Sequence, residues 1–242
     1  MLAGESVDDL RNDAGDAGVA VLPEGVASAI AHLQTQSPAP SPRAVVADLL
    51  ALEKTSKRSQ QRYDYRQLLG TWRLGFITGT AKTRQRAGTV LGAGRFLPRF
   101  VQVQLRYEAA NTLDCGGVCE GGVREGDVCD EGTATPTCPP GPIRPQGSAY
   151  NLVSLASLTL QLQGPTQYWP KTNSLAFDFT QLQVAIGGFQ LYQQSIRGGA
   201  ERATQFFAEG LKTQAFFTYF LVTPTCLAAR GRGGGLALWT RQ

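Results

Sequence analysis

The segment LLGTWRLGFITGT, residues 68–80, marks a change in the hydrophobic pattern of the chain. Before it, apolar residues recur at the spacing of one face of an amphipathic helix. Within it, Trp72, Leu74 and Phe76 alternate with polar or small residues, which is the period of an antiparallel strand with one buried face. The sequence therefore predicts that an N-terminal helical part ends near residue 68 and that a β-sheet begins there.

The period of two recurs through the rest of the chain. Two stretches, 153–162 and 175–186, change phase partway along, and we interpret each change as a bulge or sharp bend within one long strand. Barrels need such bends, and strands do not alternate with helices, so we expect a mainly β fold built on one antiparallel barrel. The other expected elements are strands at 101–108, 189–196, 215–223, 226–230 and 235–240 and a short helix at 199–211.

Composition divides the chain into three parts. We predict an acidic, flexible tail with a short helix at 1–42, a helical segment at 43–67, and the barrel at 68–242. Within the barrel, residues 110–147 contain four of the five cysteines, many glycines and prolines, and almost no apolar side chain. We expect this segment to be a loop inserted between two strands.

Several classes of function are excluded by composition. Hydrophobic residues make up 42% of the 242 residues and charged residues only 17%, which excludes an intrinsically disordered chain. His32 is the single histidine, so neither a Ser-His-Asp triad nor a multi-histidine metal site is expected. No apolar run is long enough to span a bilayer, and the acidic N-terminus does not resemble a secretory signal. We expect a cytoplasmic protein that is not an enzyme, with no catalytic residues, no cofactor and no bound metal.

Positive charge is concentrated in one stretch. Residues 65–107 hold eight bases and no acid, although the whole chain has a net charge of only +4. Such a bias favours an anionic partner surface, and the connection at 81–99 places apolar residues among its bases. We therefore expect peripheral contact with anionic lipid, the alternative being a basic face that only keeps the protein soluble. The membrane-facing candidates are Lys82, Arg84, Arg86, Arg95 and Arg99.

Two further motifs point to structure rather than chemistry. The segment RGRGGG at 230–235 lacks the features of a phosphate-binding loop and is too short for an RNA-binding tract, so we expect a hairpin and no nucleic-acid partner. Cys226 lies in a predicted strand and is expected to be a small buried residue. A metal site, disulfides and a reduced loop all remain open for the clustered cysteines Cys115, Cys119, Cys129 and Cys138.

The tripeptide Gly70-Thr71-Trp72 opens the first barrel strand and is typical of lipocalin-like barrels of the calycin type. In that arrangement the tryptophan closes one end of the barrel and an arginine near the last strands packs over its ring. We assign this closure to Trp72 and Arg230, with Arg232 as the alternative partner.

Aromatic residues are dense on the strand phase that we expect to face the barrel interior. They are the candidate lining for an apolar ligand, with plain core packing as the alternative for each of them. Strand 215–223 is also apolar on its second face, which must be covered by the N-terminal helix or by a membrane. The candidate lining residues are Trp72, Phe76, Phe177, Phe179, Phe217 and Tyr219.

Three segments taken together resemble the plastid-lipid-associated protein, or fibrillin, family, and in particular its cyanobacterial members: 68–80 (LLGTWRLGFITGT), 175–180 (LAFDFT) and 229–239 (ARGRGGGLALW). The resemblance covers 43–242 apart from 110–147. It implies a lipocalin-like barrel behind a helical part, and binding of prenylquinones, carotenoids or lipids at photosynthetic membranes. The chain departs from the family pattern in its cysteine-rich insertion and at 225–227 (TCL), where many members carry an acid.

The resemblance and the residue patterns together favour a non-catalytic carrier of an apolar small molecule or lipid, peripherally associated with a thylakoid or plasma membrane. One alternative is an interaction module with a filled barrel that binds a protein partner, either a quinone-synthesis enzyme or a photosynthetic complex. A second alternative is a calycin-type bilin lyase, against which stands the lack of a catalytic constellation in the sequence.

Overall fold

The computed structural model describes residues 22–35, 37–79, 94–110 and 144–242. Helices precede the sheet, as expected, and they are α1 (Glu24–Thr35), α2 (Pro42–Arg58) and the single turn α3 (Tyr65–Leu68). The first strand, β1, spans Gly70–Ile77, which confirms the change of structure predicted near residue 68.

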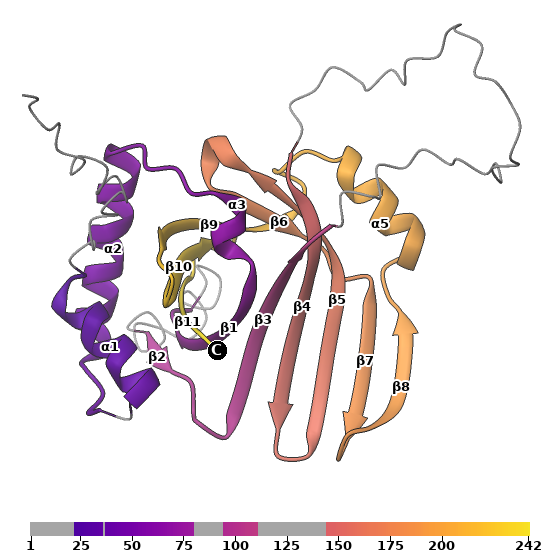
Figure 1. The fold of residues 1–242 in the computed structure, drawn as a ribbon, viewed down its shortest axis with the longest axis horizontal. Coiled ribbons are helices and arrows are strands. Elements are labelled where there is room, and N and C mark those ends of the chain that lie inside the picture. The colour runs from indigo at the N-terminus through magenta and orange to yellow at the C-terminus, as the bar shows by residue number, and fades with distance from the viewer. Residues whose placement is uncertain (1–21, 36, 80–93, 111–143) are drawn as a thin grey trace, which may run out of the picture.

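The remaining elements are mostly strands, shown in Figure 1. One helix, α5 (Gly199–Ala208), lies close to its predicted position. The strands are β2 (Arg95–Phe96), β3 (Val101–Ala109), β4 (Gln146–Leu155), β5 (Leu158–Trp169), β6 (Ser174–Phe177), β7 (Gln181–Ile186), β8 (Phe189–Ser195), β9 (Ala215–Val222), β10 (Cys226–Gly231) and β11 (Leu236–Arg241).

Within the described part of the chain, eight antiparallel strands close into a barrel, which confirms the mainly β, lipocalin-like fold with N-terminal helices. The order around the ring is β4-β3-β1-β11-β10-β9-β6-β5, and pairing of β5 with β4 closes it. The segment RGRGGG forms the hairpin between β10 and β11, as predicted.

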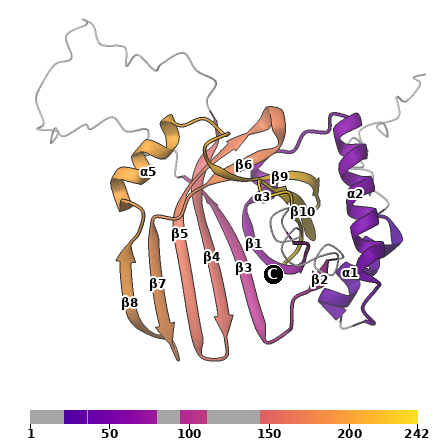
Figure 2. The same ribbon diagram turned by 180° about the vertical axis from the view of Figure 1, so that it is seen from behind.

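Three strands are longer than the barrel and leave it together. β3 pairs with β1 only at 104–107, and β5 pairs with β6 only at 166–169. Beyond these points β3, β4 and β5 continue with β7 and β8 as a sheet that projects from the barrel (Figures 1 and 2). We call this sheet the wing and define it as residues 101–104, 151–163 and 181–195.

The wing begins where β5 changes partner. β5 pairs with β7 through Leu158–Gln163 and with β6 further along, so the chain between β6 and β7 must bend. At the change lies Gly164, where a Cβ atom would stand 2.1 Å from the carbonyl oxygen of Asp178. Only glycine permits so close an approach of two backbones. The register along β5 changes by one residue between β6 and β7. The irregularity predicted within 175–186 is therefore present, but it separates two strands and does not lie within one long strand.

The other predicted bend, within 153–162, is wrong. β4 ends at Leu155, the turn contains Ala156 with a φ of 51°, and β5 begins at Leu158 as the antiparallel partner of β4. A phase change of one residue is produced equally well by a two-residue turn, because the returning strand restarts the alternation.

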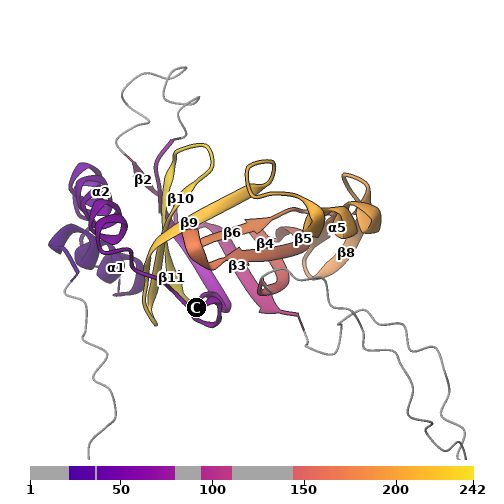
Figure 3. The same ribbon diagram turned by 90° about the horizontal axis from the view of Figure 1, so that it is seen from above.

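Two apolar clusters form the core. One lies inside the barrel and contains Trp72, Tyr107 and Trp239. The other lies between the barrel wall and helices α1 and α2, which cover one side of the barrel opposite the wing (Figure 3). Val26 and Ile30 of α1 belong to this second cluster, so α1 is part of the packed fold rather than of a flexible tail.

Both faces of strand β9 are apolar because each face packs in a different cluster. Phe217 and Tyr219 pack inside the barrel, whereas Phe220 and Leu221 pack in the cluster beneath the helices. A register shift against β10 at Ala228 places the two consecutive residues on the helix side. The N-terminal helices therefore supply the cover that the second face of this strand was expected to need.

Candidate functional site

The predicted lining residues divide between the two clusters. Trp72 and Tyr219 are buried inside the barrel, and Phe177, Phe179 and Phe217 pack against the same cluster. Phe76 does not line the barrel, because it lies beneath the helices.

A register shift between Leu74 and Phe76 explains the misplaced residue. The intervening Gly75 adds one residue to β1, which turns Phe76 to the outer face. Gly75 also lies directly under α1, where a Cβ atom would stand 2.2 Å from a Leu33 methyl group.

The predicted closure of the barrel by Trp72 is present, but its partner is Arg241 and not Arg230. Trp72 is fully buried and donates a hydrogen bond from Nε1 to the carbonyl oxygen of Leu68 at 2.7 Å. Arg241 is its cross-strand partner on β11, and the guanidinium carbon lies 4.3 Å from the ring centroid. Direct opposition in neighbouring strands is what brings the two side chains together.

Arg230 instead holds helix α2 on the barrel. It donates from Nε to Glu53 Oε1 at 2.7 Å and pairs through Nη2 with Oε2 of the same carboxylate. Glu53 is buried, and the hydrogen bonds from Arg230 hold the pKa of its carboxyl below the ordinary value of 4.5. Arg232, the alternative partner, donates to the carbonyl oxygens of Thr213 and Gln214 and does not reach Trp72 either.

The aromatic side chains inside the barrel pack against one another. Ring centroids are 5.1 Å apart for Phe177 and Phe217, and 5.3 Å apart for Phe217 and Trp239. The hydroxyl groups of Tyr107 and Tyr219 are hydrogen-bonded at 2.9 Å, and burial raises the pKa of both phenols. The interior aromatic side chains therefore pack as a protein core does. Because they pack on one another, a surface outside the barrel is the better candidate for binding an apolar ligand.

The wing offers such a surface. Residues directly opposite in paired strands point to the same face, so the pairing registers assign one set of side chains to one face of the wing. Apart from Asn151 and Gln194 at the barrel end, the set is apolar or aromatic. We call these apolar and aromatic residues the wing face: Val101, Val103, Val153, Leu155, Leu158, Leu160, Leu162, Leu182, Val184, Ile186, Phe189 and Tyr192.

No member of the wing face is buried by the described residues. The exposed fraction reaches 78% at Phe189 and stays above 40% at Leu155, Leu158 and Ile186. From the strand spacing and the rise per residue the face measures roughly 400 Å². The largest apolar patch on a typical monomer has about this size and is often functional.

The opposite face of the wing is polar and rich in glutamine. Gln161 and Gln183 are paired across β5 and β7 and point to the face opposite Leu160 and Val184. Hydrogen bonds of 2.9 Å link Gln183 to Gln190 and Gln190 to Gln193. The wing is therefore a sheet with one face suited to water and one face suited to an apolar partner.

The wing face is continuous with the barrel interior. Leu105 and Tyr107 follow Val101 and Val103 along β3 with the same orientation, and both are buried in the interior cluster. An apolar surface thus runs from the outer turns of the wing to the mouth of the barrel, with Asn151 opposite Leu105 as the polar residue at the junction.

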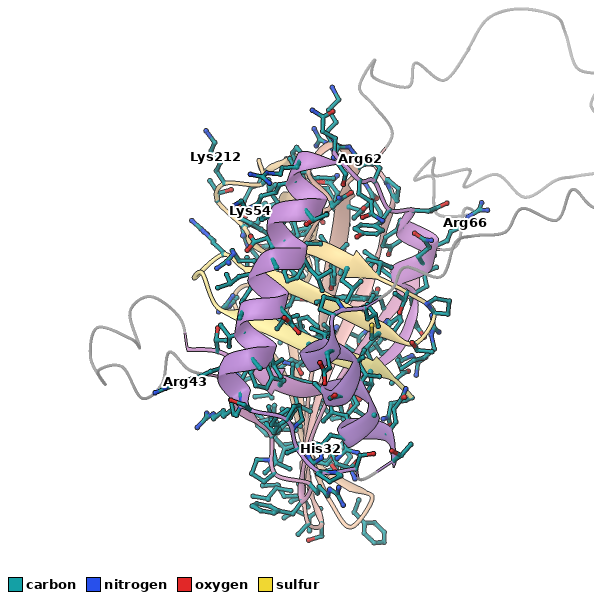
Figure 4. All side chains as sticks on the ribbon, turned by 90° about the vertical axis from the view of Figure 1, so that its left-hand side faces the viewer. His32, Arg43, Lys54, Arg62, Arg66 and Lys212 are labelled. Carbon is teal, nitrogen blue, oxygen red and sulfur yellow. The ribbon has the colours of Figure 1, made fainter. Side chains whose placement is uncertain are left out.

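The predicted basic residues are placed only in part. Lys82, Arg84 and Arg86 lie outside the described residues, while Arg95 and Arg99 are exposed near the start of β3. Figure 4 shows another set of bases, including Lys54, Arg62 and Arg66, toward the upper end of the helical side, which is the end opposite the outer turns of the wing.

Among the described residues, the buried Cys226 and the cavity beside α5 provide no second candidate site. Cys226 is buried, as predicted, and the clustered Cys115, Cys119, Cys129 and Cys138 lie outside the described residues. Among the described side chains no group of His, Cys, Asp and Glu is placed to hold a metal ion. A cavity of about 840 Å³ opens beside α5 and is lined largely by polar atoms, Glu108 and Gln163 among them.

Sequence reasoning missed the wing face, although its signal was present. Leu158, Leu160 and Leu162 alternate in the same phase as Leu182, Val184 and Ile186, and the register of β5 with β7 places the two sets side by side. What the alternation could not show is that no other described element packs on them.

No helix in the described residues combines the length and the apolar character needed to cross a membrane. No protein-family model matches the chain, and no curated protein matches it either.

Proposed function

We propose that this chain is a non-catalytic binding or carrier protein for an apolar molecule, and that the molecule lies on the wing face. The observation that carries the proposal is an apolar sheet face that the described residues leave uncovered and that leads into the barrel mouth. The resemblance to the fibrillin family supports a prenylquinone, carotenoid or lipid as the ligand, and a cytoplasmic site of action at a thylakoid or plasma membrane.

The wing face fits a long, flexible and apolar molecule better than a compact polar one. Its residues carry no charge, and the polar groups on this side of the wing are the Tyr192 hydroxyl and, at the barrel end, the amides of Asn151 and Gln194. Covering about 300 Å² of it would contribute about 7 kcal/mol before the costs of association, which is enough for a reversible complex. A polar head group would find hydrogen-bonding partners at the barrel end.

A titration with a short-tailed prenylquinone tests the proposal. The double variant Leu160→Thr with Val184→Thr places residues of high β-propensity in the strands but removes apolar surface from the wing face. We expect it to weaken binding by about 2–3 kcal/mol, or about 30- to 150-fold. The matched control is Gln161→Thr with Gln183→Thr, which alters neighbouring positions on the polar face and should leave the affinity unchanged.

The titration, together with native mass spectrometry and sedimentation velocity, separates the carrier from the alternative functions. If wild type and control bind no quinone, and native mass spectrometry of protein from a photosynthetic host shows no extractable apolar molecule, the carrier proposal fails. The packed aromatic interior would then favour the interaction module with a filled barrel. If sedimentation velocity shows a dimer that the Leu160→Thr, Val184→Thr variant dissociates, the wing face is covered by a second copy of the chain instead.

A further inference from the structure

The outer end of the wing is an apolar edge. Three connections meet there: the approach to β3, the β4–β5 turn and the β7–β8 turn (Figure 1). The pairing runs across this end without a break, from Val101 to Leu155, Leu158, Ile186 and Phe189. We call the exposed apolar residues of this end the tip row, and they are Phe100, Leu155, Leu158, Ile186 and Phe189.

The tip row contains the most exposed large apolar side chains in the described part of the molecule. Phe189 is 78% exposed and Phe100 is 70% exposed. These two phenylalanines lie at the two ends of the row, and their exposure is unfavourable in water, since each buries a large apolar area when it finds a partner. The tip row is therefore a candidate interaction surface in its own right.

The tip row is held rigidly. The β7–β8 turn uses Gly187 and Gly188, with φ values of 58° and 85°, which a tight hairpin turn requires. The backbone N–H of Gly187 donates to the carbonyl oxygen of Ser157 at 2.9 Å, and this bond ties the β7–β8 turn to the β4–β5 turn. The turns thus project as one edge rather than as separate loops.

Charge around the tip row favours an anionic surface. The turns at 155–158 and 186–189 carry no charged residue, and the wing contains no acid at all. The nearest charged side chain in sequence is the exposed Arg99, directly before Phe100, and the exposed Arg95 lies in the same connection. An approaching anionic surface would meet bases and apolar groups there, and the residues of the wing itself present no repelling carboxylate.

We propose that the tip row docks the protein on an anionic lipid leaflet, with Phe100 and Phe189 inserted among the lipids and Arg95 and Arg99 at the head groups. A narrow row of side chains along a sheet edge presents much less area than a stable protein–protein interface needs, whereas insertion into a leaflet requires only a few side chains of this kind. The lipid surface is therefore the partner that the shape of this edge fits.

Docking by the tip row gives the wing face a route to its ligand. With the edge in the leaflet, the wing face would open directly onto the acyl chains, and an apolar molecule could pass from the leaflet onto the sheet without crossing water. This route rests on the proposed function, whereas the docking itself does not, because it depends only on the tip row and its neighbouring bases.

Vesicle co-sedimentation of the full chain tests the docking. The vesicles are an equimolar mixture of phosphatidylglycerol and phosphatidylcholine, compared with phosphatidylcholine alone. We expect Phe100→Ser with Phe189→Ser to weaken binding to the anionic vesicles by about tenfold or more. The control, Leu50→Ser, removes an exposed apolar residue of α2 and should change binding by less than about twofold.

A second readout reports insertion directly. In the variant Phe189→Trp, the new indole should be quenched by brominated lipids. Of the native tryptophans, Trp72 and Trp239 are buried and Trp169 is partly buried at the end of β5 remote from the tip, so wild type should show little quenching and supplies the baseline. Equal binding by the tip variant and the control, absence of binding to either vesicle, or a lack of quenching would each overturn the proposal. A tip-dependent dimer in the absence of vesicles would also overturn it in favour of contact between copies.

The two proposals can fail separately. The single variant Phe100→Ser, which alters no residue of the wing face, should weaken docking but still bind a prenylquinone presented in detergent. The Leu160→Thr, Val184→Thr variant should still dock on anionic vesicles, because its tip row is intact. Loss of both activities in both variants would show that neither surface acts alone as described.

Discussion

Replacing Glu53 by glutamine should loosen helix α2 from the barrel. Glu53 is buried, with its side chain 8% exposed, and it receives hydrogen bonds from Arg230 of β10 and from Lys57 of its own helix. The neutral amide introduced by Glu53→Gln would leave the Arg230 guanidinium without its counter-charge in a partly buried position. Breaking a buried pair by removing one partner typically costs about 3–5 kcal/mol.

The expected cost is smaller here because Arg230 is 29% exposed and can be partly solvated. We expect the free energy of unfolding to fall by about 2–3 kcal/mol. Urea unfolding followed by circular dichroism measures it. With an unchanged slope, the midpoint should move down by roughly 1 M.

Lys57→Gln supplies the control on the same carboxylate. Lys57 is 67% exposed and lies one helical turn from Glu53, so its loss should cost only about 0.3–0.5 kcal/mol. A Glu53→Gln variant that is as stable as wild type, or no less stable than Lys57→Gln, would refute the view that Arg230 anchors α2.

The difference in unfolding free energy between wild type and Glu53→Gln should also depend on pH. Because the folded-state pKa of Glu53 lies below its unfolded value, near 4.5, the ion pair stabilises the fold fully above that value. Its contribution is lost as the pH falls through the folded-state pKa. The stability gap between wild type and Glu53→Gln should therefore narrow below about pH 4.5 and remain constant at neutral pH.

Three other outcomes are expected. Arg241→Ala should uncover the ring of Trp72, lowering stability by about 1 kcal/mol and shifting the tryptophan emission to longer wavelength. Phe76→Ala should cost about 3–4 kcal/mol in a denaturant titration, since it opens a cavity beneath the helices, yet prenylquinone affinity should not change. Charge reversal in the basic stretch should weaken co-sedimentation with anionic vesicles and reduce its salt dependence, and the change to test is Lys82→Glu with Arg84→Glu and Arg86→Glu.

The alternation of apolar residues was sufficient to predict most of the strands and the barrel. The switch at 68–80 and the strands at 215–223, 226–230 and 235–240 depend on local periodicity, which the sequence shows directly. The orientation of single side chains was less predictable. One added residue at Gly75 turned Phe76 from the interior to the helix side, and a bulge leaves no distinct mark in a pattern of period two.

Features that depend on pairing between distant strands could not be predicted. Trp72 meets Arg241 because β1 pairs with β11 in one particular register, whereas sequence position alone favoured Arg230. The exposure of the wing face likewise depends on contacts between segments that are distant in the sequence. The leucines of β5 and the apolar residues of β7 were visible in the sequence, but whether a sheet face is covered depends on which elements pack against it.

The location of a bound ligand tests the central claim most directly. A prenylquinone analogue with a photoreactive group on its tail can be cross-linked to the full chain, and the labelled residues mapped by peptide mass spectrometry. If the ligand lies on the wing face, the labels should fall within 151–162 and 182–192. Labels confined to interior residues such as Phe217 and Trp239, or labels that free prenylquinone does not compete away, would contradict it.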